Sequence, residues 1–168
     1  SLTTPPFLMN REAYEGVVDL TDFEEVMYKI EDHDLYLIAT SEHPITARFK
    51  NEIIELKDGP LKFAGISTNF RREVGAHGIS DRGIWRVHQF SKVEQVIICK
   101  PEDSKEMHNE ILENATLIFK KLEIPFRVID ICTGDIGTVA ARKFDIEAWM
   151  PSSKKWKEVV SASNCKSY

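Results

Sequence analysis

The segment from Arg71 to Gln95 constrains the fold of this chain more than any other feature. Leu61–Phe70, which precedes it, is apolar and rich in β-forming residues, and Val96–Cys99, which follows it, is apolar. The intervening loop at 76–83 contains Gly, His and Asp. Two apolar runs that flank such a loop predict a β-hairpin.

The second strand of this hairpin is expected to carry different residues on its two faces. Side chains alternate along a strand, so Ile84–Ile98 would place polar and aromatic residues on one side and apolar residues on the other. The first set is Arg86, His88, Phe90, Lys92 and Glu94, and the second is Trp85, Val87, Val93 and Ile97. We expect the apolar face to pack and the polar face to bind a ligand.

The spacing on the polar face suits a nucleotide. At about 3.3 Å per residue, Phe90 and Glu94 lie roughly 13 Å apart, which is about the length of an aminoacyl nucleotide. Phe90 can stack on a base and Glu94 can hold an amine or a hydroxyl. Arg71 and Arg86 can bind phosphate by charge-assisted hydrogen bonds. The alternative is a solvated strand face with ordinary ion pairs, which contribute little.

Three motifs occur in order along the chain: Thr40–Glu42, then Phe70–Glu73 with Arg86–Gln95 beyond the loop, then Glu158–Ser161. They resemble, respectively, the serine-binding threonine-x-glutamate loop, motif 2, and the strand for ATP and magnesium of the class II aminoacyl-tRNA synthetases, in the form found in seryl-tRNA synthetases. The motif 2 match is long and specific, and the three together cover most of the chain.

The resemblance implies an activity: activation of L-serine with ATP to seryl-adenylate, and transfer of the serine to tRNA(Ser), with tRNA(Sec) as a second candidate. Thr40 and Glu42 would contact the ammonium group of serine. Arg71 would bridge its carboxylate and the α-phosphate of ATP. Glu94 would accept a hydrogen bond from the serine hydroxyl, and a buried acceptor of this kind discriminates against alanine by about 10⁴.

The resemblance also implies how ATP and its metal would bind. Arg86 would hold the γ-phosphate, and Phe90 would stack on adenine with Glu73 nearby. Mg²⁺, a hard cation suited to oxygen ligands, would bind Glu158 and Ser161. The resemblance implies that Arg71 and Arg86 are the catalytic residues. The residues implied for ATP binding are Arg71, Glu73, Arg86, Val87, Phe90, Glu158 and Ser161.

Two of these assignments have structural alternatives. Thr40 or Ser41 can simply cap a helix that starts near Glu42. Glu158 can be an exposed strand carboxylate beside Lys157. Positions 158 and 161 also lie on opposite faces of a regular strand, so shared metal binding requires a β-bulge or a bridging phosphate.

The remaining pattern predicts an α+β fold with a mostly antiparallel sheet flanked by helices, as the resemblance also implies. Apolar residues at helical spacing predict an amphipathic helix over Glu102–Leu122. The predicted strands beside the hairpin are Leu35–Ala39, Ile124–Cys132, Lys143–Met150 and Trp156–Ser163. Asp22 is expected to cap a short helix through about Ile30.

Composition limits the function classes. The 168 residues suit a single domain, and the net charge of −5 argues against a general nucleic-acid coat. With no apolar run of 18 residues and no signal-peptide layout, we expect no membrane partner and a cytoplasmic location. No zinc site is expected, because Cys99, Cys132 and Cys165 lack ligand spacing and Thr40–Glu42 resembles the metal-free pocket.

We expect residues 1–168 to form a single partial catalytic domain. Thr3–Asn10, with Pro5 and Pro6, resembles the tail of motif 1, near the interface of a homodimer; the motif 3 helix and an N-terminal coiled-coil arm are absent from this sequence. Two other functions stay open. One is a stand-alone amino-acid ligase that charges a carrier protein, and the other is a non-catalytic module for nucleotide binding or dimerisation.

Overall fold

The computed structural model describes residues 1–18, 24–74 and 85–166. The chain divides into two compact units, Ser1–Ile98 and Cys99–Tyr168, which are described in turn. Asp22 and the loop at 76–83 lie outside the described residues. Helices and antiparallel sheets occur together, so the predicted α+β class is confirmed. No helix of the described part is long and apolar enough to cross a membrane.

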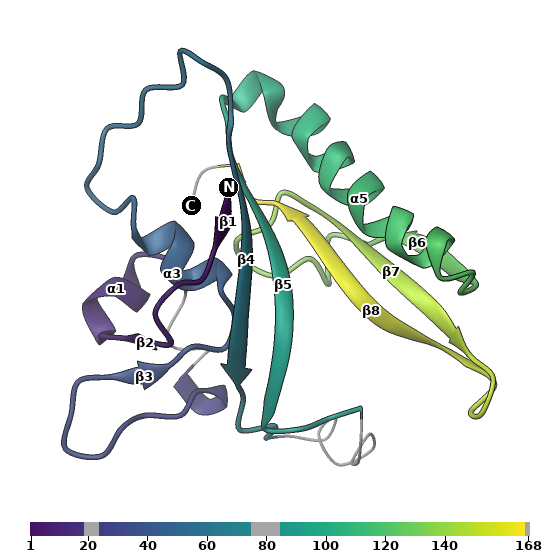
Figure 1. The fold of residues 1–168 in the computed structure, drawn as a ribbon, viewed down its shortest axis with the longest axis horizontal. Helices are drawn as coiled ribbons and strands as arrows, with labels where there is room; N and C mark the ends of the chain where they lie inside the picture. Colours follow the sequence, from purple (N-terminus) through teal and green to yellow (C-terminus); the bar gives the residue numbers. More distant parts are fainter. Residues whose placement is uncertain (19–23, 75–84, 167–168) are drawn as a thin grey trace. The chain divides into compact units, whose positions relative to one another are not determined.

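The first unit is built on a three-stranded sheet in the order β1-β4-β5 (Figure 1). Its strands are β1 (Leu2–Thr3), β4 (Leu61–Phe70) and β5 (Gln89–Ile98). β1 pairs with β4 in parallel, whereas β4 and β5 form a long antiparallel ladder. The predicted hairpin is therefore confirmed, although its second strand begins at residue 89 rather than 84.

Short elements surround this sheet. β2 (Leu8–Met9) pairs with β3 (Tyr36–Leu37), α1 spans Arg11–Glu15, η1 spans Glu24–Val26, and α3 spans Glu42–Ala47. The predicted helix through Ile30 is wrong. After the single 3₁₀ turn of η1 the chain is drawn into extended pairing instead, because Lys29 forms a bridge with Tyr36 and the Tyr28 carbonyl accepts from the Leu37 amide.

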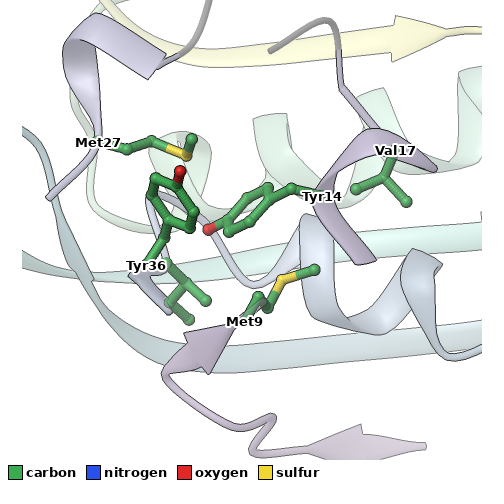
Figure 2. Packing of buried hydrophobic residues seen from close by; sticks show 6 residues of the cluster. Met9, Tyr14, Val17, Met27 and Tyr36 are labelled. Carbon is green, nitrogen blue, oxygen red and sulfur yellow. The ribbon is translucent and has the colours of Figure 1, made fainter. Parts of the chain in front are cut away.

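These short elements enclose the core of the first unit. Figure 2 shows its buried side chains, in which the rings of Tyr14 and Tyr36 meet edge to face with centroids 5.9 Å apart. Both rings are almost fully buried, and such pairs add to the free energy gained by burial alone. The complete cluster is Met9, Tyr14, Val17, Met27, Tyr36 and Ile38. It supports the segment that leads from β3 into α3.

The second unit contains one long helix and an antiparallel sheet. Its elements are η2 (Pro101–Asp103), α5 (Ser104–Lys121), β6 (Phe126–Asp130), β7 (Arg142–Met150) and β8 (Lys155–Asn164), with strand order β6-β7-β8. α5 covers one face of this sheet: His108 Nε2 donates to the Ala162 carbonyl at 2.9 Å, and its ring lies 5.0 Å from that of Phe144.

A β-bulge interrupts the pairing of β7 with β8. Ile146 pairs with Val160 and the next residue, Glu147, pairs with Glu158, so Val159 is the extra residue. Ser161 pairs with Asp145, two residues from Glu147 on β7. Because residues two apart share a face, Glu158 and Ser161 also lie on one face. A shared role of these two residues required a β-bulge or a bridging phosphate, and the β-bulge is present.

The predicted packing of the apolar face of β5 is wrong for three of its four residues, whereas Ile97 is half-buried. Val93 is 65% exposed, and Trp85 and Val87 before the strand are 62% and 40% exposed. The cause is the position of α3, which lies on the other face of the hairpin. There Gly65 on β4, paired with Glu94 on β5, faces the side chain of Ser41.

Candidate active site

The loop between β3 and α3 places Thr40 at a buried position facing β5. Thr40 is 3% exposed, and its hydroxyl donates to Glu94 Oε2 at 2.9 Å while accepting from the Glu42 amide at 3.2 Å. Ser41, the N-cap residue of α3, makes no side-chain capping bond. The helix-capping alternative thus holds for Thr40, whose hydroxyl also joins two of the predicted motifs.

Glycine at position 65 permits this contact. A Cβ on Gly65 would lie 2.5 Å from the Ser41 hydroxyl oxygen and 2.6 Å from Cδ1 of Ile45. Gly65 is also the register partner of Glu94. The start of α3 therefore lies against bare backbone directly opposite Glu94, which sets the distance from Thr40 to that carboxylate.

A charged group also reaches the carboxylate oxygen that Thr40 contacts. Lys92 Nζ lies 2.5 Å from Glu94 Oε2, and the two side chains are 33% and 20% exposed. Residues 92 and 94 share a face of β5, as the alternation of side chains predicts. Oε2 of Glu94 is thus contacted both by the hydroxyl of Thr40 and by the ammonium group of Lys92.

The first turn of α3 disfavours charge. Burial raises the pKa of the Glu42 carboxyl, and nearby Glu94 raises it further, against the opposing effects of Lys92 and Arg71. Burial, then Lys92 and Arg71, lowers the pKa of His43 to about 3. A cationic ligand beside Glu42 would favour its ionised form, because an opposite charge stabilises a carboxylate. The predicted ammonium group of serine is such a ligand.

Arg71 lies between this loop and Phe90. Its Nε donates to the carbonyl of Ala39, the residue before Thr40, at 3.3 Å, and its guanidinium lies 5.3 Å from the centre of the Phe90 ring. The Arg71 amide also donates to the His88 carbonyl at 3.0 Å, which ties the end of β4 to the start of β5. The predicted serine and nucleotide contacts thus lie on either side of one arginine.

Arg86 and Glu73, for which separate roles were predicted, form an ion pair. Arg86 Nη1 lies 2.7 Å from Glu73 Oε2, and the Glu73 side chain is 13% exposed. Glu73 has a φ of 52°, a conformation that is uncommon for residues other than glycine. Nε of Arg86 is buried and has no hydrogen-bond partner among the described residues. A buried guanidinium donor without a partner in the described part of the chain fits an anionic ligand.

Sequence reasoning missed one contact at this end of the site. The hydroxyl of Tyr28 lies 2.6 Å from Nδ1 of His88, and the two rings are 6.1 Å apart. His88 belonged to the predicted polar face, but Tyr28 lies 60 residues away and outside any motif. A signal of local spacing could not have paired them.

Glu158 and Ser161 lie in the second unit, and both are exposed. Asp145, the register partner of Ser161, was not predicted: it is 7% exposed, and its Oδ1 has no hydrogen-bond partner in the described part of the chain. Within residues 1–18, 24–74 and 85–166, no group of three or more His, Cys, Asp or Glu side chains is placed to hold a metal. The donors on this face are oxygens, which suit Mg²⁺ when phosphates and water complete its shell.

Comparison with known proteins assigns the chain to a family. Residues 25–168 match the family model of the tRNA synthetase class II core domain (G, H, P, S and T). The serine–tRNA ligase of Methanocella arvoryzae is 63% identical over 165 residues, which is 98% of this chain and 39% of that protein. This chain therefore spans about two fifths of the length of the curated relative.

Two solved structures share the fold at substantial identity. Seryl-tRNA synthetase from Pyrococcus horikoshii, complexed with ATP, has a TM-score of 0.94 at 53% identity, covering 99% of this chain and 37% of that chain. Cytoplasmic serine–tRNA ligase from Naegleria fowleri, in complex with AMP, has a TM-score of 0.89 at 42% identity, covering 98% and 40%.

Proposed function

Because this chain belongs to the family of the class II tRNA synthetase core domain, we propose that it is part of the catalytic core of a serine–tRNA ligase. It activates L-serine with ATP and transfers the serine to tRNA(Ser), with tRNA(Sec) as a second acceptor. The homodimer and the cytoplasmic location that the resemblance implies belong to the same proposal. Identity of 63% to a serine–tRNA ligase supports it.

One observation carries the choice of serine: the 2.9 Å hydrogen bond from Thr40 Oγ1 to Glu94 Oε2. It joins the two sequence motifs that would read the ammonium and hydroxyl groups of the amino acid, 54 residues apart. Arg71, which donates to the Ala39 carbonyl beside them, supplies the cation that a substrate carboxylate needs. The three ionic or polar groups of serine therefore each have a partner in one small region.

The chemistry is an in-line displacement. An oxygen of the serine carboxylate bonds to the α-phosphorus of ATP, the bond from that phosphorus to the β-phosphate bridging oxygen breaks, and pyrophosphate leaves; no proton has to move. Catalysis then depends on position and charge, since the reactants already have the required protonation states. Arg71 holds the two reacting groups together, and Arg86 binds the γ-phosphate through its Nε, which has no hydrogen-bond partner among the described residues.

Adenine stacks on Phe90, whose ring centre lies 5.3 Å from the guanidinium carbon of Arg71. Glu73 then exchanges its ion pair with Arg86 for contact with the base, because the arginine is needed at the phosphates. Glu158 and Ser161 would hold Mg²⁺ through oxygen donors, and Val87 would contribute to the nucleotide contact. The metal, when bound, neutralises charge on the phosphates. In the transfer step the hydroxyl oxygen of the tRNA terminal ribose bonds to the carbonyl carbon of the seryl group, and the bond from that carbon to the phosphate oxygen of AMP breaks. AMP leaves, and the hydroxyl proton passes to water.

ATP–pyrophosphate exchange with each of the twenty amino acids tests the proposal. The whole protein, of the length of the curated relatives, should exchange with serine far faster than with alanine or glycine. A second arm supplies tRNA or a carrier protein as acceptor. Transfer to the carrier alone would favour the amino-acid ligase, and nucleotide binding without exchange would favour the non-catalytic module.

A further inference from the structure

Lys92 has no role in the predicted site, yet it contacts the residue proposed to read the hydroxyl of serine. Its Nζ lies 2.5 Å from Oε2 of Glu94. It also acts on the first turn of α3, since it opposes the raised pKa of Glu42 and contributes to the lowered pKa of His43. Lys92 is therefore a charged group that acts both on β5 and on the first turn of α3.

The contacts of Glu94 are unevenly divided between its two oxygens. The hydroxyl of Thr40 and the ammonium of Lys92 both lie against Oε2. Oε1 takes part in none of the hydrogen bonds or ion pairs found for Glu94 among the described residues. A carboxylate held in this way has one oxygen fixed by the protein and one left to accept from a ligand.

The charge balance of the pocket also depends on Lys92. Glu42 and Glu94 repel each other when both are ionised, and the nearby cations are Lys92 and Arg71. Arg71 is already directed to the Ala39 carbonyl and the Phe90 ring, and its proposed partners are the substrate carboxylate and phosphate. Without Lys92, two carboxylates would face each other with one cation that the substrate also needs, and one of them would tend to hold a proton.

We propose that Lys92 is a positioning residue for amino-acid specificity: it fixes Glu94 through Oε2 and leaves Oε1 to accept from the substrate hydroxyl. The inference rests on the proposed function, because it requires serine as the amino acid. It differs from a simple ion pair, which would contribute little to substrate use.

Two substitutions of Lys92 test this inference, with exchange kinetics measured from pH 6 to pH 8. Lys92→Met should lower serine kcat/KM about tenfold or more, since a half-buried carboxylate loses its fixed partner, and should leave the KM for ATP within about twofold. The loss should be largest at low pH, because without Lys92 the pKa of Glu42 rises further. Lys92→Arg should retain most of the activity.

Lys57→Met is the matched control. Lys57 forms an ion pair with Glu55, two residues away in the sequence as Lys92 is from Glu94, and its Nζ lies 2.6 Å from Glu55 Oε2. Both of these side chains are largely exposed. This variant should match the parent protein in every parameter, and a melting curve for each variant shows whether it is folded.

Three results would overturn the inference: no loss in Lys92→Met, equal losses for serine and ATP, or a loss in Lys92→Arg as large as that in Lys92→Met. Failure of the proposed function gives a different result, in which the parent protein itself shows no serine-dependent exchange. That outcome removes the inference as well.

Discussion

Substitution of Gly65 by alanine should damage the amino-acid pocket without touching any proposed substrate contact. The new Cβ would lie 2.5 Å from Oγ and 2.9 Å from Cβ of Ser41, and 2.6 Å from Cδ1 of Ile45. Ordinary contact begins near 3.4 Å, so the shortest of these distances is roughly 0.9 Å too small. The end of the Ile45 side chain can rotate away, but the Ser41 side chain is short and moves with the backbone of the loop.

The consequence falls on Thr40, the neighbour of Ser41. Its hydrogen bond to Glu94 is 2.9 Å long, and a retreat of most of an ångström takes it beyond hydrogen-bonding distance. Overpacking of this kind costs about 1–3 kcal/mol of stability. A misplacement of about 1 Å in a catalytic site lowers the rate by about 10²-fold. We therefore expect serine kcat/KM to fall between about tenfold and a hundredfold, with the KM for ATP nearly unchanged.

The assay is serine-dependent ATP–pyrophosphate exchange, with Gly134→Ala as the matched control. Nothing lies within 4 Å of a Cβ at Gly134, so this variant should behave as the parent does. Adding Ser41→Gly to Gly65→Ala removes Oγ and Cβ of Ser41 and leaves only the movable end of Ile45 in close contact. The double variant should regain part of the activity, since the Ser41 hydroxyl has no hydrogen-bond partner among the described residues. Unchanged serine use in Gly65→Ala, or no recovery in the double variant, would refute the reasoning.

Three further predictions concern single residues. Glu94→Ala should reduce serine kcat/KM more than ATP affinity, and Glu94→Gln should be milder because its amide oxygen still accepts; equal losses for both substrates would place Glu94 in the scaffold. The folded pKa of His43, about 3, lies below its ordinary 6.5, so the unfolded chain binds more protons between these values. The free energy of unfolding, measured with urea, should then fall by about 1–2 kcal/mol from pH 6.5 to pH 5. An unchanged pH dependence in His43→Leu would contradict this. Asn10 Oδ1 caps α1 by accepting from the Ala13 amide at 2.9 Å, so Asn10→Ala should lower the free energy of unfolding by about 1 kcal/mol. An unaltered unfolding midpoint would show that this cap does not contribute to stability.

The hairpin was predictable because its signals are local. The apolar run of β4 matched its predicted bounds, and the alternation of side chains placed Phe90, Lys92 and Glu94 on one face. The bounds of β7 and β8 were also close to prediction. The alternation of side chains alone indicated that Glu158 and Ser161 need a β-bulge or a bridging phosphate to act together, and the β-bulge is present. In each case the relevant information lies within about ten residues of sequence.

The parts that could not be predicted depend on contacts between distant segments. Val93 is exposed because α3 packs on the opposite face of the hairpin. The pattern of residues along a strand does not indicate which face a helix will cover. The core around Tyr14 and Tyr36 is formed by two-residue strands and a five-residue helix, too short to show a period. Lys92 could be placed on the right face, but its contact with the same oxygen as Thr40 is a property of the folded chain.

Binding of a non-hydrolysable seryl-adenylate analogue, a seryl sulfamoyl adenosine, tests the central claim most directly: Thr40, Arg71, Phe90 and Glu94 form one site for serine and adenosine nucleotide. Calorimetry on the whole protein should give a much higher affinity for the seryl compound than for its alanyl counterpart, by up to about 10⁴-fold, because only the seryl compound pairs with Glu94. Glu94→Ala should abolish that preference while retaining affinity for the adenosine part. Equal affinity for the seryl and alanyl compounds in the parent protein would contradict the account.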